Sequence, residues 1–569
     1  MRKAHYKDLL TPFRALRRRV IWLPVAAIAL LSLTVAWRQN DAYFEITKNL
    51  DIFGRILREV NLNFVEEVEP NKFVRTGIDA MLKTLDPYTN FISASEIEDY
   101  RFISTGQYGG IGALIDKREG KFIIREPYED SPATKAGLRA GDHLIQVDKE
   151  KLEGRDLEIS DVRNLLRGQP KTVVTLIVRR QGEPEPLTLT VTRDDIKIKN
   201  VRYSTLVQGD IAYVDLKGFT QEASADVRAA LEALQKQNPT LKGIVLDLRD
   251  NPGGLLQEAI NVSNLFVNRD ERIVETRGKM EGSNRVYTAT QTPFNTQIPL
   301  AVLINGGSAS ASEIVSGVMQ DLDRGVVVGK RSFGKGLVQT TVKLSYNTQL
   351  KITTARYYTP SGRCIQAVDY GNRDANGAAT RTADSLKQSF LTRNGRKVLD
   401  AGGIDPDLRV DERTFHKVAQ DLSAQNIIFD FATSYRVKHA ELGAKPADFQ
   451  ITDALYDEFL QFVRERKFKY EPSLSRQIRD LREASKKEKY FEQLSGQLQA
   501  LESLAEQLSE NDLKAHREEI ALLLRAEIVS RYYYAKGRTE VLLASDDALN
   551  QAIALLRNPT EYNKMLGRK

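Results

Sequence analysis

The spacing of apolar and polar residues changes along the chain and predicts a different kind of structure in each part. In residues 41–100, apolar residues recur at intervals of three and four, which predicts two or three amphipathic helices and then the turn LDPYTNF. In residues 200–410, buried-strand patterns such as GIVLDLRD alternate with helical patterns such as EASADVRAALEALQKQ, which predicts an α/β unit. Residues 411–569 have helical periodicity almost throughout. We therefore expect a multidomain α/β protein with a helical segment at each end.

An uncharged apolar segment, residues 20–37, follows a basic N-terminal segment, residues 1–19, which holds seven Lys or Arg and one Asp. As a helix the apolar segment would be about 27 Å long, enough to span a membrane. The positive-inside rule then keeps the basic segment in the cytoplasm and places the rest of the chain outside, anchored in the inner membrane on the periplasmic side. The alternative is a signal peptide cleaved near Thr34-Val35-Ala36, followed by secretion. Both interpretations predict export.

Composition excludes several classes of partner and cofactor. The 569 residues are 41% hydrophobic and 28% charged, which is typical of globular domains. The 83 basic and 76 acidic residues make a mixed surface, so we expect no nucleic-acid partner. Cys364 is the single cysteine, so neither a disulfide within the chain nor a cysteine metal cluster can form. The sequence implies no metal and no other cofactor.

The stretch GKRSFGKG, Gly329 to Gly336, has the spacing of a nucleotide-binding loop but lacks two of its parts. The residue after Lys335 is Gly336, where a phosphate-binding loop needs Ser or Thr to hold magnesium. The segment that follows, LVQTTVKLS, has the pattern of a strand, so no helix N-terminus faces the phosphates. The sequence therefore argues against an ATPase and leaves Lys335 to be explained.

The run PLAVLINGGSASASEIVSGVMQD predicts a strand, a glycine turn and a helix, and places Ser310 where the helix begins. Free N–H groups and the helix dipole can stabilise an oxyanion at such a position. Position 312 is Ser, so the Gly-x-Ser-x-Gly pattern of many hydrolases is absent. Ser310 could instead be a helix cap, a role that Ser308 or Ser312 could serve equally well.

No histidine lies near Ser310 in sequence, because the chain has only His5, His143, His416, His439 and His516. The nearest candidate for a general base is Lys335. Its amine can act as a base if burial lowers its pKa toward neutrality. Phe333, Leu337 and Val338 would supply the apolar surroundings.

Residues 104–195 mix glycine-rich turns with short apolar runs, and the segment SPATKAGLRAGDHLIQVD resembles a PDZ domain. PDZ domains bind a peptide's C-terminus as an added strand and hold its carboxylate in a loop of backbone N–H groups. The alternative is that the glycines form a hairpin turn and the apolar helix residues belong to the core. A PDZ domain in this position could also serve as an inhibitory lid. The peptide groove implied by the resemblance consists of Gly109, Gly110, Ile111, Gly112, Val162, Leu165 and Leu166.

Five ordered motifs, LDPYTNF, DLRDNPGG, GGSASASEI, RSFGKGLVQ and TPSGRCIQ…GGIDPD, together resemble the C-terminal processing peptidases, or tail-specific proteases, over residues 41–410. This resemblance implies a serine endopeptidase that recognises unstructured C-terminal tails of proteins. It implies Ser310 as the nucleophile, Lys335 as the general base and Gln339 as the residue that orients the lysine. It also implies that the N–H groups of Gly254 and Ala311 form the oxyanion hole. A non-catalytic PDZ scaffold derived from such proteases is the competing interpretation.

Residue types agree with these implied roles. Gln339 follows Lys335 by four positions in a strand-like run, so both side chains are expected on one face, with the amide oxygen accepting from the amine. Gly254 has no Cβ, which allows its N–H to approach a tetrahedral intermediate closely. Residues 367–401 are predicted to form a surface flap. The helical extension, residues 411–569, could form a homo-oligomer interface, dock an adaptor, enclose the site or cap its own protease domain.

Overall fold

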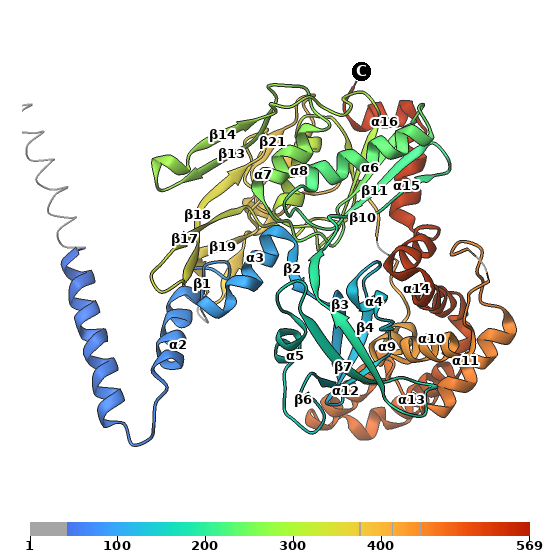
Figure 1. The fold of residues 1–569 in the computed structure, drawn as a ribbon. Helices are drawn as coiled ribbons and strands as arrows, with labels where there is room; N and C mark the ends of the chain where they lie inside the picture. Colours follow the sequence, from blue (N-terminus) through green and yellow to red (C-terminus); the bar gives the residue numbers. More distant parts are fainter. Residues whose placement is uncertain (1–42, 375–376, 412, 444, 569) are drawn as a thin grey trace, which may run out of the picture. The chain divides into compact units, whose positions relative to one another are not determined.

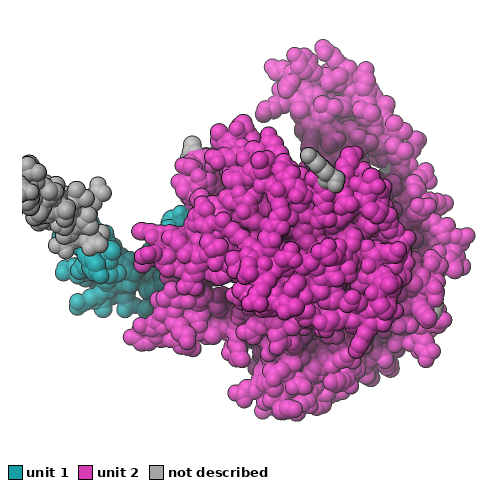
Figure 2. All heavy atoms as spheres, turned by 90° about the horizontal axis from the view of Figure 1, so that it is seen from above, with its two compact units in different colours: residues 1–91 teal, residues 92–569 magenta. Residues whose placement is uncertain are grey.

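The computed structural model describes residues 43–374, 377–411, 413–443 and 445–568 (Figure 1). The chain divides into two compact units, with the boundary after Phe91 (Figure 2). The predicted membrane segment at residues 20–37 lies outside the described residues. Within the described ranges, we find no helix that is both long enough and apolar enough to cross a membrane.

The first unit contains the helices predicted from the three- and four-residue spacing. The described residues 43–63 are helical, and α2 (Pro70–Lys83) follows. The motif LDPYTNF then forms a turn, because the carboxylate of Asp86 accepts hydrogen bonds from the N–H groups of Tyr88 and Thr89, both at 2.8 Å. The short strand β1 (Asn90–Ile92) ends this part of the chain.

The second unit begins at Ile92, and its first α-helix, α3 (Ile97–Thr105), leads into a PDZ-like domain. Its antiparallel sheet has the strand order β3-β4-β5-β7-β8, with β6 paired to β5. The alternation in KTVVTLIVRR becomes β7, in which Val174, Leu176 and Val178 point into the core. The elements are β2 (Gln107–Gly110), β3 (Ala113–Arg118), β4 (Lys121–Pro127), α4 (Pro132–Lys135), β5 (His143–Val147), β6 (Glu150–Lys151), α5 (Ile159–Leu166), β7 (Val173–Arg179), β8 (Leu187–Thr192) and β9 (Asp194–Lys197).

A six-stranded sheet of order β10-β11-β12-β15-β16-β23 forms the centre of the α/β domain, and only the β10–β11 pair is antiparallel. Successive side chains of β12 point to opposite faces of the sheet, so Ile244 and Leu246 pack in one apolar cluster and Val245 in another. Both faces are therefore covered, as parallel sheets require. The elements are β10 (Val201–Val207), β11 (Ile211–Leu216), α6 (Ala223–Gln237), β12 (Gly243–Asp247), α7 (Leu256–Asn264), β15 (Leu300–Ile304), α8 (Ala311–Asp321), β16 (Val326–Gly329) and β23 (Leu408–Arg409).

A second sheet contains the strands that flank Lys335 and its neighbours. Within residues 92–569 its antiparallel order is β14-β13-β18-β17. The strands are β13 (Arg272–Gly278), β14 (Arg285–Thr288), β17 (Leu337–Lys343) and β18 (Gln349–Tyr358).

Residues 367–401, expected as a surface flap, contain two short hairpins. The second hairpin is fixed to the end of α8, because the N–H of Arg393 donates to the carbonyl of Asp321 at 2.9 Å and that of Asn394 to the carboxylate of Asp323 at 2.5 Å. Pairing between the strands of each hairpin provides hydrogen-bond partners for the backbone N–H and C=O groups of this polar segment. The strands are β19 (Val368–Arg373), β20 (Ala379–Arg381), β21 (Ser389–Leu391) and β22 (Lys397–Leu399).

The C-terminal helices serve two different structures. Helices α9, α10, α11 and α14 share one core, which includes Phe431, Phe459 and Leu524. Helices α12 and α13 share a smaller apolar cluster, formed by Ile478, Leu498 and Ala505. Helices α15 and α16 instead cover the second face of the six-stranded sheet, where Ile553 joins one apolar cluster with Val245 (Figure 1). The elements are α9 (Lys417–Ala424), α10 (Ile427–Lys438), α11 (Asp453–Glu465), α12 (Ser473–Lys487), α13 (Phe491–Ala515), α14 (Arg517–Leu543), α15 (Asp547–Leu556) and α16 (Pro559–Met565).

Candidate active site

Ser310 occupies the turn between β15 and α8, as the sequence pattern predicts. Its φ of 54° and ψ of −109° lie in a region that non-glycine residues rarely adopt, which stores strain at this position. Ser310 is half-buried, whereas Ser308 and Ser312 are fully buried. The Ser308 hydroxyl donates to the carbonyl of Leu248 at 2.8 Å, and the Ser312 hydroxyl to that of Asn251 at 2.9 Å. Of the three serines, Ser310 is therefore the one that a substrate can reach.

The motif DLRDNPGG follows β12 and packs directly against the serine turn. A Cβ at Gly253 would lie 2.9 Å from both the amide nitrogen of Ala311 and the Cβ of Ser310, and one at Gly254 would lie 2.4 Å from the carbonyl oxygen of Phe219. Only glycines permit this approach. Among the described residues, we find no protein acceptor for the N–H groups of Gly254 and Ala311. Both groups are therefore available to an oxygen atom of a ligand.

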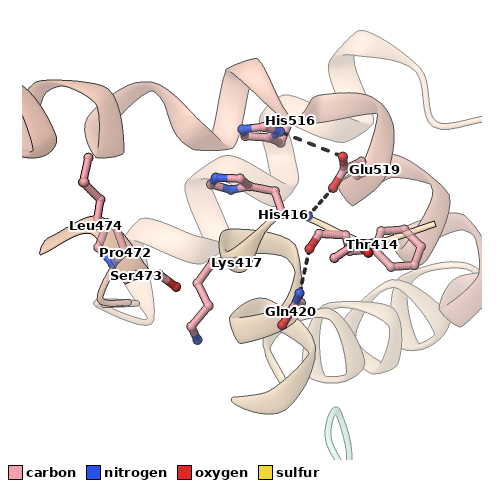
Figure 3. A pocket seen from close by; sticks show the side chains of 10 residues that line it. Thr414, His416, Lys417, Gln420, Pro472, Ser473, Leu474, His516 and Glu519 are labelled. Atoms are coloured by element: carbon pink, nitrogen blue, oxygen red, sulfur yellow. Dashed lines mark hydrogen bonds and ion pairs between the residues drawn. The ribbon is translucent and has the colours of Figure 1, made fainter. Parts of the chain in front are cut away.

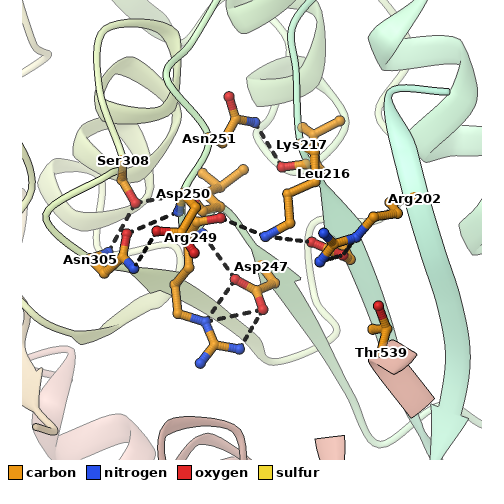
Figure 4. A network of polar contacts seen from close by, with 12 residues as sticks. Arg202, Leu216, Lys217, Asp247, Arg249, Asp250, Asn251, Asn305, Ser308 and Thr539 are labelled. Carbon is orange, nitrogen blue, oxygen red and sulfur yellow. Dashed lines mark hydrogen bonds and ion pairs between the residues drawn. The ribbon is translucent and has the colours of Figure 1, made fainter. Parts of the chain in front are cut away.

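A polar network holds the same loop in place (Figure 4). The Asn305 side chain bonds Asp250 twice, accepting from its N–H and donating to its carboxylate, both at 2.9 Å. The Arg249 guanidinium donates to Asp247 at 2.5 Å and to Asp546 at 2.6 Å. Burial alone would raise the pKa of Asp247, but the charge and hydrogen bonds of Arg249 outweigh it and lower that pKa to about 2. The carboxylate thus stays ionised and keeps the loop fixed at neutral pH.

Lys335 is half-buried and lies in the loop between β16 and β17, two residues before the strand begins. Gln339 lies within β17, where its amide nitrogen donates to the hydroxyl of Thr353 at 3.2 Å. The strand register shifts between Val338 and Gln339. The extra residue at this shift, Thr354, lies on β18, so β17 itself is continuous. The expectation that Lys335 and Gln339 share one strand-like run is corrected because Lys335 lies in the loop before the strand, and strand alternation does not fix the direction of its side chain. Of the predicted apolar neighbours of Lys335, Leu337 is buried and Phe333 is exposed.

Two buried side chains join the serine turn to the lysine loop. The Glu313 carboxylate accepts hydrogen bonds from the N–H of Ser310 at 2.8 Å and from that of Lys335 at 2.9 Å, both on Oε2. The Tyr357 hydroxyl lies 3.1 Å from the carbonyl oxygen of Ser310 and 2.7 Å from that of Lys335. Sequence reasoning missed both residues. The pattern Ser-x-x-Glu from Ser310 to Glu313 is a capping-box signature and could have identified the glutamate.

The PDZ-like domain has a cavity of about 190 Å³ between β3 and α5. Ile111 and Leu166 line it, as the resemblance implies, and Ile159, Arg163 and Arg167 border it as well. These last three residues were not predicted. The lining is completed by Phe102, Tyr108, Ala113, Leu114, Ile115 and Tyr128.

Other predicted groove residues lie elsewhere. Val162 is fully buried in the core of the PDZ-like domain, because it occupies the inner face of α5, and Leu165 packs against the same core. Gly109 and Gly110 belong to β2, which pairs with β9, and so they are not part of an open loop. Gly112 has a φ of 77°, which favours glycine, and directs the chain from β2 into β3.

A separate cavity of about 550 Å³ lies among the C-terminal helices (Figure 3). His416 and His516 border it, and their rings stack with centroids 3.7 Å apart and planes 4° apart. With Asp512 they offer ligand atoms that lie within 4.8 Å of one another. A metal ion lies in the plane of each imidazole that binds it, about 2.1 Å from the nitrogen. Two nearly parallel stacked rings do not direct their lone pairs at one point, so this geometry does not form a metal site.

Three family matches follow the domain order of the fold. Residues 123–180 match a PDZ domain, residues 210–371 match peptidase family S41, and residues 418–556 match the C-terminal helical domain of probable PDZ-proteases. The predicted fold class is confirmed by this order and by the mixed α/β structure.

Relatives with assigned names match the chain over most of their length. The carboxy-terminal-processing protease of Bartonella bacilliformis is 41% identical over 323 residues, which cover 56% of this chain and 73% of the relative. A probable CtpA-like serine protease of Staphylococcus epidermidis is 30% identical over 363 residues, which cover 63% and 72%. A solved photosystem II D1 C-terminal processing protease is 30% identical with a TM-score of 0.34, and the match covers 62% of this chain and 85% of that one. The chain therefore belongs to the C-terminal processing peptidase family, within peptidase family S41, and is a serine-type peptidase.

Proposed function

We propose that this peptidase cleaves protein substrates by acyl transfer, with Ser310 as the nucleophile and Lys335 as the general base. One observation carries the proposal: the backbones of Ser310 and Lys335 share the hydrogen-bonding partners Glu313 and Tyr357, so the two residues lie side by side. The uncommitted N–H groups of nearby Gly254 and Ala311 support the same assignment. A non-catalytic scaffold would not require this arrangement.

In the proposed reaction, the neutral amine of Lys335 accepts the proton of the Ser310 hydroxyl as the serine oxygen attacks the scissile carbonyl carbon. The N–H groups of Gly254 and Ala311 donate to the oxyanion that forms. The Lys335 ammonium then gives its proton to the leaving amine, and an acyl-enzyme remains. Water attacks this ester with Lys335 again as the base, which releases the acid and restores the serine. Gln339 would accept a hydrogen bond from the amine without adding a negative charge.

We further propose that the substrates are unstructured C-terminal regions of proteins, bound by their free carboxylate in the PDZ-like domain. The cavity there is lined by apolar side chains such as Ile111 and Leu166, with Arg163 and Arg167 at its border. An apolar last residue would enter the cavity while the carboxylate meets backbone N–H groups and cationic side chains. The names of the Bartonella and photosystem II proteases agree with this substrate class.

A peptide with a free C-terminal carboxylate should bind at least about ten-fold more tightly than its amide, because charge-assisted hydrogen bonds contribute roughly 1.5–3 kcal/mol. Fluorescence anisotropy with the full-length Ser310→Ala variant measures this without cleavage. Ile159→Glu, at the cavity, should weaken binding of the acid peptide, whereas Val173→Glu, which adds the same charge at an exposed site of the domain, should not. Equal affinity for acid and amide would contradict the proposal.

We also propose that the protein is exported and that residues 20–37 anchor it in the inner membrane, on the basis of the basic segment that precedes them. Full-length protein should then stay in the membrane fraction after a high-salt wash, because ions do not screen burial in hydrocarbon. A variant without residues 1–40 lacks the proposed anchor and should not stay in the membrane fraction after the same wash. Release of a species that begins near residue 37 would show a cleaved signal peptide, and an uncleaved cytoplasmic protein would contradict export.

A further inference from the structure

We infer that Glu313 and Tyr357 are positioning residues for the peptidase reaction, which together form a clamp that fixes Ser310 and Lys335 relative to each other. The clamp acts through the backbones of the two residues and contacts neither the substrate nor the reacting atoms. The inference rests on the proposed Ser-Lys reaction and adds two residues to it.

Glu313 is a fully buried carboxylate that accepts four hydrogen bonds from the described residues around it. Oε2 accepts from the N–H groups of Ser310 and Lys335, and Oε1 accepts from the N–H of Gly334 at 2.7 Å and from the Ser332 hydroxyl at 2.5 Å. Burial raises the pKa of Glu313, and the four hydrogen bonds oppose that rise. Only an ionised carboxylate accepts all four bonds, since a protonated one would have to place its own proton against a donor.

Tyr357 completes the arrangement on the carbonyl side. The residue lies on β18 and is buried, and its hydroxyl reaches the carbonyl oxygens of Ser310 and Lys335. Burial raises the pKa of this phenol well above its usual value, so the hydroxyl remains a donor. The N–H of Tyr357 also donates to the carbonyl of Gly336 at 3.0 Å, so β18 holds the lysine loop by its backbone as well.

The geometry gives the clamp a specific task. Ser310 is in a strained conformation at the start of α8, and Lys335 is in a loop, so neither residue has its position fixed by a regular strand or helix interior. One oxygen of the Glu313 carboxylate accepts hydrogen bonds from both backbone N–H groups, and the Tyr357 hydroxyl faces both backbone carbonyl groups. Because a misplacement of about 1 Å between reacting groups can lower a rate by roughly 100-fold, this shared anchoring sets the rate of proton transfer rather than the affinity for substrate.

The test compares steady-state cleavage of a peptide by full-length wild type, Glu313→Gln, Tyr357→Phe and the double variant. We expect Glu313→Gln to lower kcat by about 10- to 100-fold, because an amide nitrogen would face N–H donors, and Tyr357→Phe to lower it by about 3- to 10-fold. KM should stay within about two-fold. The double variant should lose less than the product of the single effects, because both residues control the same geometry.

Asp323→Asn is the matched control. Asp323 is also a buried carboxylate, lies just beyond the other end of α8 and pairs with Arg396 at 2.6 Å. We expect this variant to lose thermal stability while its kcat stays within about two-fold of wild type. A similar loss of kcat in Asp323→Asn would show that any buried charge near α8 has this effect, and would overturn the inference.

The remaining outcomes also decide the question. Wild-type kcat in folded Glu313→Gln and Tyr357→Phe, or a rise in KM alone, overturns the clamp. If Glu313→Gln does not fold, as judged by circular dichroism, Tyr357→Phe decides, since it keeps the ring and removes one hydroxyl. Failure of the proposed reaction is recognised separately, because Ser310→Ala or Lys335→Ala would then keep its activity.

Discussion

Replacing Lys335 with Arg should abolish peptide cleavage as completely as replacing Ser310 with Ala, a loss of at least about 1,000-fold in kcat. Arginine keeps the positive charge, but its guanidinium does not lose a proton near neutral pH and so cannot serve as the base. Lys335→Ala should be equally inactive. Hydrolysis of a peptide with a free C-terminus, measured beside thermal unfolding, separates lost chemistry from lost fold.

The pH dependence gives a second readout of the same assignment. An exposed lysine has a pKa near about 10.4, so a lysine base needs surroundings that disfavour its charged form. We expect the wild-type rate to rise with pH along a single limb with its midpoint well below 10.4, because activity requires the neutral amine. A midpoint at the ordinary lysine value would contradict the proposed base.

Histidine variants are the matched control. In the described ranges, Nε2 of His143 lies 3.7 Å from Oε1 of Glu153 in the PDZ-like domain. His416 stacks on His516, and His439 stacks on Tyr435. Each has its contacts outside the serine turn and the lysine loop. Replacing the histidines should leave kcat within a few-fold of wild type. An active Lys335→Arg enzyme, or a folded single-histidine variant without activity, would overturn the Ser-Lys assignment.

Removal of residues 546–569 should prevent the protease domain from folding. The deletion strips α15 and α16 from the six-stranded sheet and exposes the face that contains Val245 and Leu303. At about 1.5–3 kcal/mol for each large apolar side chain, the lost burial amounts to roughly 10 kcal/mol or more, comparable to the whole stability of a typical domain. The side chains removed from this core are Leu549, Ala552, Ile553, Leu555, Leu556, Tyr562 and Leu566.

Soluble yield and thermal unfolding of the truncated chain measure this effect. Point variants test the same packing quantitatively. Ile553→Ala, in the core, should lower the free energy of unfolding by about 2–5 kcal/mol. Gln551→Ala, on the exposed face of the same helix, should leave it nearly unchanged. A truncated protein with wild-type solubility and unfolding temperature would show that these helices are dispensable. The deletion also removes Asp546, which pairs with Arg249 in the loop beside Ser310.

Local patterns were sufficient for most secondary structure and for part of the site. The buried-strand pattern of GIVLDLRD predicted β12, and the strand-turn-helix pattern placed Ser310 at the start of α8. These features depend on residues a few positions apart, so periodicity records them directly. The same reasoning did not place Lys335 relative to Gln339, because Lys335 lies in the loop before β17 and strand alternation does not extend to it.

Contacts between distant segments decided the remainder. From the sequence came the order of helices and strands, the prediction of Lys335 as the base because no histidine lies near Ser310 and, through the family motifs, the class of peptidase. The family resemblance implied Ser310 among the three serines, and the fold supplies the physical reason, because the hydroxyls of Ser308 and Ser312 donate to carbonyls about 60 positions away. Only the tertiary structure placed Glu313 between two loops and α15 on the central sheet. Burial and hydrogen-bond partners depend on which segments meet in space, and the spacing of residues along a single segment does not contain that information.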